Sequence, residues 1–272
     1  MTERQLDLFS DVDVQTASRA QESVRRPVVA TDLDDAALIA AIPGASLADS
    51  AALAAEAARR RLRAAVPALA ALCRRFTGFG ADRLVPEQEA ALRALAAVGG
   101  PDAAKAVSAM ISRAVVQGPT LVAAAAAAAQ LSATLPAEIL ESLLRHADPA
   151  VRVAGCRCAR PFPEIMTLLV GLLGDHDRTV ASSAACALGR LGRSEARPAL
   201  KKLLGEQPSR EVVEAVAAIA DEECMVLLGR LARNRPAFAS AAVDALESID
   251  HPRASVIAAA VRRDAGSAAE RG

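Results

Sequence analysis

The sequence predicts an all-α fold, an α-solenoid built from about seven antiparallel helix pairs. Apolar residues recur with helical spacing along most of the chain, and the breaks between them restart near residues 99, 132, 160, 192, 221 and 250. The unit is therefore roughly thirty residues long. The 272 residues include five Phe but no Trp or Tyr, so neighbouring helices must approach through small side chains.

The clearest copy of the unit lies in residues 164–196. Its first helix has an apolar stripe at helical spacing: Ile165, Leu168, Leu169, Leu172 and Leu173. Asp177 is placed to cap a second helix. That helix has its own stripe: Val180, Ala184, Ala187, Leu188 and Leu191. Two short helices cannot bury both stripes against each other alone, so the unit needs copies on either side.

The other pairs follow in order. The first begins near Asp32, breaks at Pro43 and Gly44, and restarts near Ser46. The next two cover residues 65–100 and 101–131, and the later ones occupy 136–159, 197–220 and 223–249, before a last helix over 253–263. We expect three regions: a flexible tail over residues 1–30, the solenoid over 31–263 and a disordered tail over 264–272.

Seven consecutive alanines, Ala123 to Ala129, lie in the second helix of the third pair. Alanine is the best intrinsic helix former, so the run is interpreted as low complexity in a helix. A close-packed seam between helices is the alternative, and neither interpretation implies a function.

Four phrases indicate a family: AVPALAALC, RPALKKLLGE, HADPAVRVAG and DHDRTVASSAACALGRLG. They resemble HEAT repeats of the short kind also found in phycobilisome-lyase-type proteins. The resemblance covers most of residues 33–263, is strong over 136–205, and weakens toward the N-terminus, where the Asp turn is missing. It implies a superhelix with a concave surface lined by the second helices. It does not imply one function, because such solenoids serve many unrelated partners.

Composition limits the function classes. Lys plus Arg and Asp plus Glu number 32 each, so no overall field draws the chain to nucleic acid or an acidic membrane. No segment is long and apolar enough to span a bilayer. The five cysteines are an odd number in small apolar positions, which indicates a reducing compartment and a cytoplasmic protein.

The sharpest functional signal is a pentapeptide in the N-terminal tail: Gln5, Leu6, Asp7, Leu8 and Phe9. It resembles the motif by which bacterial replication and repair proteins dock onto the DNA sliding clamp. The resemblance implies that Leu8 and Phe9 fill a hydrophobic pocket, that Leu6 covers an adjoining one, and that Gln5 hydrogen-bonds at the rim. The alternatives are a chance match, or docking of the same apolar residues onto the solenoid itself.

Basic residues form several clusters, and the best candidate for a phosphate contact is Arg59, Arg60, Arg61 and Arg63. The expected concave helices carry charges of both signs: Arg93, Arg152, Arg157, Arg190, Glu211, Glu214, Asp244 and Glu247. This mixture favours solvated surfaces, so direct nucleic-acid binding is expected to be weak or absent.

No cofactor or metal is expected. Cys156 and Cys158, near His146 or His176, could suggest a metal site, but residues two apart on a helix diverge, so core cysteines are favoured. The recurring acids Asp148, Asp175, Asp177 and Asp250 are predicted to be caps and turn formers.

The leading hypothesis is a non-catalytic adaptor that binds a protein on its concave face and docks on the sliding clamp, in replication or repair. The first alternative is a general interaction scaffold without a DNA-metabolic role. The second is a DNA glycosylase-type lesion binder, which is disfavoured because such HEAT-like enzymes are expected to use Trp and Tyr, both absent from the chain.

Overall fold

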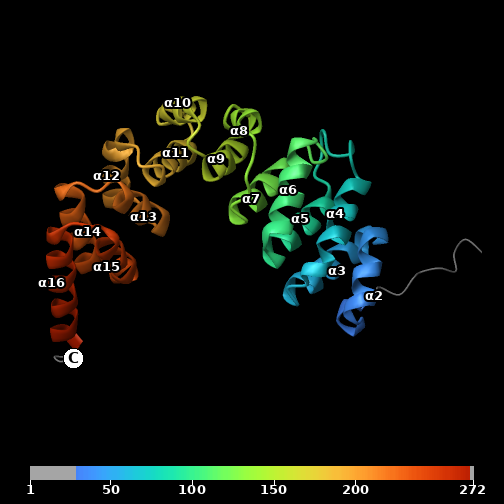
Figure 1. Ribbon diagram of the computed structural model, residues 1–272, viewed down its shortest axis with the longest axis horizontal. Helices are drawn as coiled ribbons and strands as arrows, with labels where there is room; N and C mark the ends of the chain where they lie inside the picture. Colours follow the sequence, from blue (N-terminus) through green and yellow to red (C-terminus); the bar gives the residue numbers. More distant parts are fainter. Residues whose placement is uncertain (1–28, 270–272) are drawn as a thin grey trace, which may run out of the picture.

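The computed structural model describes residues 29–269, with side chains up to residue 264, and this part of the chain contains α-helices and short 3-10 helices but no strand. The helices alternate between two layers of an arch (Figure 1). The outer layer holds α2 (Asp35–Ala41), α4 (Val66–Arg75), α6 (Pro101–Ser112), α8 (Ala137–Leu144), α10 (Pro163–Leu172), α12 (Arg197–Glu206), α14 (Glu222–Asn234) and α16 (Pro252–Ala269). The inner layer holds α3 (Leu47–Arg59), α5 (Pro86–Val98), α7 (Thr120–Gln130), α9 (Pro149–Cys158), α11 (Arg178–Arg190), α13 (Arg210–Ala218) and α15 (Ala239–Ser248).

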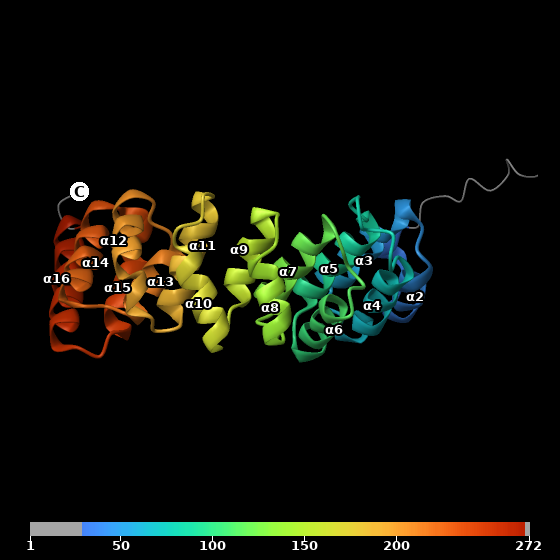
Figure 2. The same ribbon diagram turned by 90° about the horizontal axis from the view of Figure 1, so that it is seen from above.

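Each inner helix packs on the next one, so α3 to α15 form a continuous row. Figure 2 shows the pairs following one another in chain order from α2 at one end to α16 at the other. The predicted α-solenoid is therefore confirmed, with seven pairs and a terminal helix. The second helix of every pair lines the concave side, as the resemblance implied (Figure 1).

Short polar side chains begin many of these helices. The residues that accept a backbone N–H in the first turn are Asp34, Ser46, Asp148, Asp177, Ser209 and Asp221. Proline stands in the first turn of others, such as α5 and α6, where its missing N–H costs nothing. The predicted caps Asp148 and Asp177 are confirmed, and α3 begins after Ser46 as expected, whereas the first helix is capped by Asp34 and not Asp32.

Small residues let the inner helices approach closely. A Cβ atom on Gly189 of α11 would lie 2.8 Å from the carbonyl oxygen of Ala215 in α13, so this contact requires glycine. Within the alanine run, Ala124, Ala125 and Ala128 are fully buried in α7, which packs between α5 and α9. The buried face of the run is therefore a close-packed seam, which the absent Cγ atoms permit, whereas Ala126 on the opposite face is exposed.

In the N-terminal half, long connections are held by buried polar groups. Gln88 is fully buried, and its amide nitrogen donates to the carbonyl oxygens of Cys73 at 3.0 Å and Val115 at 3.1 Å. The hydroxyl of Thr120 accepts the backbone N–H of Val85 at 3.0 Å. These bonds join the start of α5 to α4, to the connection after α6 and to the start of α7.

The last helix differs from its predicted bounds. The solenoid was expected to end at residue 263, but α16 continues through Ala269. The residues after Arg263 include three alanines in this helix, and their high helix propensity explains the extension.

Candidate functional site

Three hollows on the concave face join into one groove. The first lies between α5 and α7 and measures about 580 Å³, the second crosses α7 to α13 at about 340 Å³, and the third lies between α13 and α15 at about 740 Å³. Gln130 lines both the first and the second, and Glu214 lines both the second and the third. The groove therefore runs along the inner layer from α5 to α15.

The first hollow has an apolar floor. Ala96 and Ala97 of α5 face Val122 and Ala126 of α7 across it. The charged residues Glu89 and Arg93 at its edge form an ion pair with each other, one helical turn apart. This part of the groove can bury apolar side chains of a ligand and offers little net charge.

The second hollow is crossed by an ion pair between helices that are not neighbours. Arg157 of α9 reaches over α11 to Glu211 of α13, with 3.2 Å between nitrogen and oxygen. Ser183 and Cys186 of α11 lie in the same hollow, and their small side chains leave the space. The side chains of Arg157 and Glu211 are about half exposed, at 51% and 55%, so water screens this pair and a ligand can compete for it.

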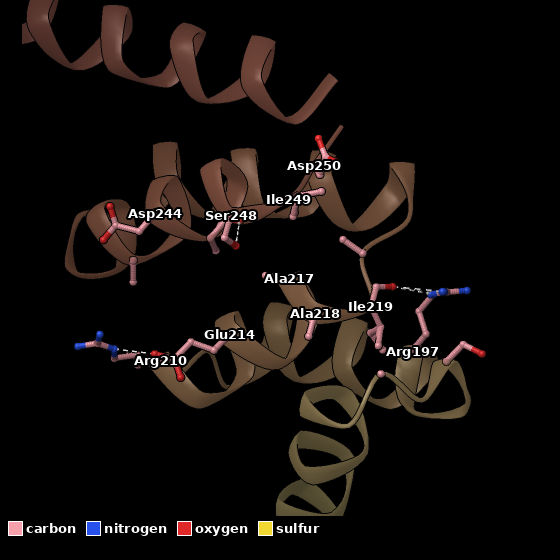
Figure 3. Close-up of a pocket in the computed structure, with 15 residues that line it drawn as sticks. Arg197, Arg210, Glu214, Ala217, Ala218, Ile219, Asp244, Ser248, Ile249 and Asp250 are labelled. Atoms are coloured by element: carbon pink, nitrogen blue, oxygen red, sulfur yellow. Dashed lines mark hydrogen bonds and ion pairs between the residues drawn. The ribbon is translucent and has the colours of Figure 1, made fainter. Parts of the chain in front are cut away.

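The third hollow follows the gap between α13 and α15, as Figure 3 shows. Arg210 and Glu214 of α13 form an ion pair of 2.8 Å at one end. Asp244 and Asp250 belong to the α15 side, and Ala217 and Ala218 to the α13 side (Figure 3).

The groove as a whole combines small apolar residues with charges of both signs. Three of its arginines, Arg93, Arg157 and Arg210, each pair with a glutamate. A DNA-binding groove needs an uncompensated basic track to neutralise phosphates, and paired charges do not supply one. The mixed concave surface that the sequence predicted is confirmed for these residues.

Arg152 is an exception to that prediction. Its side chain is only 8% exposed and forms a two-pronged ion pair with Asp175, with both nitrogen–oxygen distances 3.0 Å. It also donates to the carbonyl oxygens of His146 and Ala147. Arg152 therefore links two consecutive pairs inside the fold and does not line the groove.

The predicted turn acids have distinct roles. Asp148 and Asp177 cap α9 and α11. Asp175 accepts the N–H of Asp177 at 2.9 Å, as a turn former does, and also pairs with Arg152. Burial raises the pKa of Asp175, but the hydrogen bonds from Arg152 and Asp177 outweigh this effect, so the pKa lies below its usual value. Sequence reasoning missed the ion pair because its partners are 23 residues apart.

The candidate phosphate cluster divides into two kinds of residue. The side chain of Arg60 is only 18% exposed and is engaged with Glu56 at 2.6 Å, Asp35 at 2.9 Å and the carbonyl oxygen of Leu33 at 2.8 Å. Arg59 is exposed and pairs with Glu56 at 2.7 Å. Hydrogen bonds from Arg59 and Arg60 lower the pKa of Glu56 to about 2. The Arg60 side chain therefore joins α3 to the residues at the start of α2 and stabilises the first helix pair.

Arg61 and Arg63 are exposed in the connection between α3 and α4. The part of the chain that the structure describes contains no hydrogen bond or ion pair from either side chain. A phosphate contact at this cluster stays a prediction, and it concerns these two residues more than Arg60. The pentapeptide Gln5 to Phe9 lies outside the described residues, so its role also stays a prediction.

All five cysteines are buried with free thiols, as the predicted core positions require. Burial raises the pKa of Cys73 and Cys156 to about 12, and that of Cys158 and Cys186 to about 11. Among residues 29–264 no group of three His, Cys, Asp or Glu side chains is arranged to hold a metal ion. Within the same range, no helix is long and apolar enough to cross a membrane.

Comparison with known proteins identifies the repeats in the middle of the chain. Residues 136–220 match a family model described as HEAT repeats. The crystal structure of the Escherichia coli protein YibA is similar, at 14% sequence identity and a TM-score of 0.41, covering 91% of this chain and 100% of that one. A search of curated proteins gave no match. The HEAT resemblance predicted for residues 136–205 is thus confirmed by the family match over 136–220.

Proposed function

We propose that this protein is a non-catalytic scaffold that holds a protein partner in its concave groove. The observation that supports this most is the continuity of the groove, whose three hollows share Gln130 and Glu214. Solenoids use extended concave surfaces of this kind for binding. An alanine floor with paired charges of both signs also suits the mixed polarity of a protein interface better than it suits a phosphate backbone.

The proposal is tested by photo-crosslinking from each face of the full-length protein in cells. A photoreactive amino acid replaces Ala126, which is exposed on α7 in the groove, or Ser142, which is exposed on α8 in the outer layer. We expect a discrete protein adduct from position 126, identified by mass spectrometry, and no adduct of the same partner from position 142. Equal adducts from both positions would contradict groove binding.

We further propose that Gln5 to Phe9 docks this scaffold onto the bacterial sliding clamp, which would place it in the cytoplasm, in replication or repair. The support is the match of all five residues to the clamp-binding motif. Burial of Leu6, Leu8 and Phe9 at about 1.5–3 kcal/mol each, less the cost of ordering the segment, gives an affinity on the order of micromolar. Residues 10–30 would connect the docked motif to the solenoid.

Fluorescence polarisation with purified clamp tests this second proposal. The probe is a labelled peptide of residues 1–14, and its control is the same peptide with Leu8→Ala and Phe9→Ala. We expect micromolar binding of the native peptide and at least tenfold weaker binding of the control. Equal binding by the two peptides would leave the general scaffold without a DNA-metabolic role as the better account.

A further inference from the structure

Long polar side chains donate hydrogen bonds to the C-terminal ends of three successive inner helices. In each case a side chain at the end of one inner helix donates to a carbonyl oxygen at the end of the preceding one. The three donors and acceptors are Gln130 to Ala96 at 3.4 Å, Arg160 to Ser132 at 2.9 Å, and Arg190 to Cys156 at 3.3 Å. These carbonyl oxygens lie in or just beyond the last turn of a helix, where the helix dipole is negative, and that of Cys156 also accepts the N–H of Ala159.

This ladder of donors stops at α13 and α15. Gln130 and Arg190 are the last residues of α7 and α11, but the last residue of α13 is Ala218 and that of α15 is Ser248. Neither is long enough to reach a neighbouring helix, and the Ser248 hydroxyl donates to Ala245 of its own helix at 2.7 Å. The third hollow opens here and, at about 740 Å³, has roughly twice the volume of the second, about 340 Å³.

The hollow between α13 and α15 has unbalanced negative charge. Its two arginines are already engaged, Arg210 with Glu214 and Arg197 with Asp221 and the carbonyl oxygen of Ile219. Asp250 is exposed and has no hydrogen bond or ion pair in the described part of the chain. The carboxylate of Asp244 accepts a hydrogen bond from a neutral group, the Ser240 hydroxyl, at 3.4 Å.

The end of each helix adds to this negative potential. Ile219 and Ile249 follow the last turns of α13 and α15, and both line the same end of the hollow, near Asp250 (Figure 3). Arg197 shows that a guanidinium group suits this environment, because it already donates to the carbonyl oxygen of Ile219. The floor is apolar, with Ala217, Ala241 and Ala245 among its residues.

We propose that this hollow binds a segment of a protein partner that carries an arginine or lysine next to apolar residues. The apolar residues pack on the alanine floor. The cationic group enters the hollow beside Arg197, where α15 supplies no counterpart of Gln130 or Arg190, and it pairs with Asp244 or Asp250. The inference rests on the proposed scaffold function and specifies the chemistry of one part of its partner.

The test starts from a phage-displayed library of random twelve-residue peptides, selected on the immobilised full-length protein. The selected peptides are then labelled and their dissociation constants measured by fluorescence polarisation. Asp244→Asn with Asp250→Asn removes the two carboxylates of the hollow that have no ion pair in the described part of the chain. Ser248→Arg supplies the missing donor from the chain itself and should fill the hollow.

The matched control is Asp82→Asn with Glu206→Gln, which removes two exposed carboxylates outside the groove. We expect selected peptides to contain Arg or Lys and to bind both hollow variants at least tenfold more weakly, while the control variant stays within twofold of the native protein. Circular dichroism and urea midpoints verify that all variants are folded.

Two results would overturn the inference while leaving the scaffold proposal in place. The first is selection of peptides without Arg or Lys. The second is peptide binding that Arg157→Ala in the second hollow weakens but that neither hollow variant affects. Failure to select any peptide would contradict both this inference and groove binding.

Discussion

The N-terminal half of the arch and its middle repeats have the same architecture but are held together in different ways. In residues 136–220 an Asp turn starts the inner helices α9 and α11, and the buried pair of Arg152 and Asp175 joins one unit to the next. In the N-terminal half this turn is replaced by contacts that occur once, such as the Gln88 amide and the Arg60 guanidinium. The comparison shows why a repeat model matches only the middle: the fold continues where the repeated residues do not.

The largest effect is expected at the buried ion pair of the middle repeats. Arg152→Ala should lower the free energy of unfolding by about 3–5 kcal/mol, because Asp175 is left buried and unpaired. Arg145→Ala removes an exposed arginine from its pair with Glu141 and should cost less than about 0.5 kcal/mol. Urea unfolding followed by circular dichroism measures both. Similar losses from the two variants would show that the buried pair does not join the repeats.

The corresponding change in the N-terminal half is Gln88→Leu. It leaves the buried carbonyl oxygens of Cys73 and Val115 without a donor, so we expect a loss of about 2–3 kcal/mol in urea unfolding. Gln130→Leu is the control, because its single long hydrogen bond to Ala96 is exposed, and it should cost less than about 1 kcal/mol. Hydrogen exchange should locate the weakening in α4 to α6. Exchange that increases first in α11 to α15 would refute this account.

Glycine provides a third comparison between positions within the middle repeats. Gly189→Ala places a methyl group against the backbone of α13 and should destabilise the protein by about 1–3 kcal/mol. Gly171→Ala in α10 meets no atom within 4 Å and should stabilise it by about 0.5–1 kcal/mol, because alanine favours the helix. Opposite shifts in thermal unfolding temperature are the expected result. A loss in both variants would mean that backbone freedom, and not close packing, selects glycine at position 189.

The smallest effect is a pH dependence confined to the first helix pair. The folded pKa of Glu56 is lowered from 4.5 to about 2 by hydrogen bonds from Arg59 and Arg60. The contribution of Glu56 to the free energy of unfolding is therefore complete above pH 4.5 and is lost as pH falls toward about 2. Glu56→Gln should flatten the decline of unfolding temperature in that window, with little change for Glu164→Gln on α10. An unchanged acid profile in Glu56→Gln would show that the ion pairs do not stabilise this end.

Part of the candidate groove could be predicted and part could not. The sequence placed Arg157, Arg190 and Glu211 on concave helices, since helical spacing fixes which residues share a face. It misplaced Arg152 because spacing does not show that a charge has a buried partner 23 residues away. Asp250 was predicted to be a turn former, and only the packed structure shows that it borders the third hollow.

The sequence by itself determined the helices and their pairing, and its resemblance to HEAT repeats implied the layer to which each belongs. Apolar periodicity, caps and glycines act over a few residues and are therefore visible in one dimension. The tertiary structure decided which side chains meet across repeats. In the packed structure one face of the alanine run is buried between helices, and Arg152 is buried against Asp175. The third hollow lies beyond Arg190, where the row of side-chain donors from Gln130 to Arg190 ends. Those outcomes depend on distances between residues from separate repeats, which are set by how the helices stack.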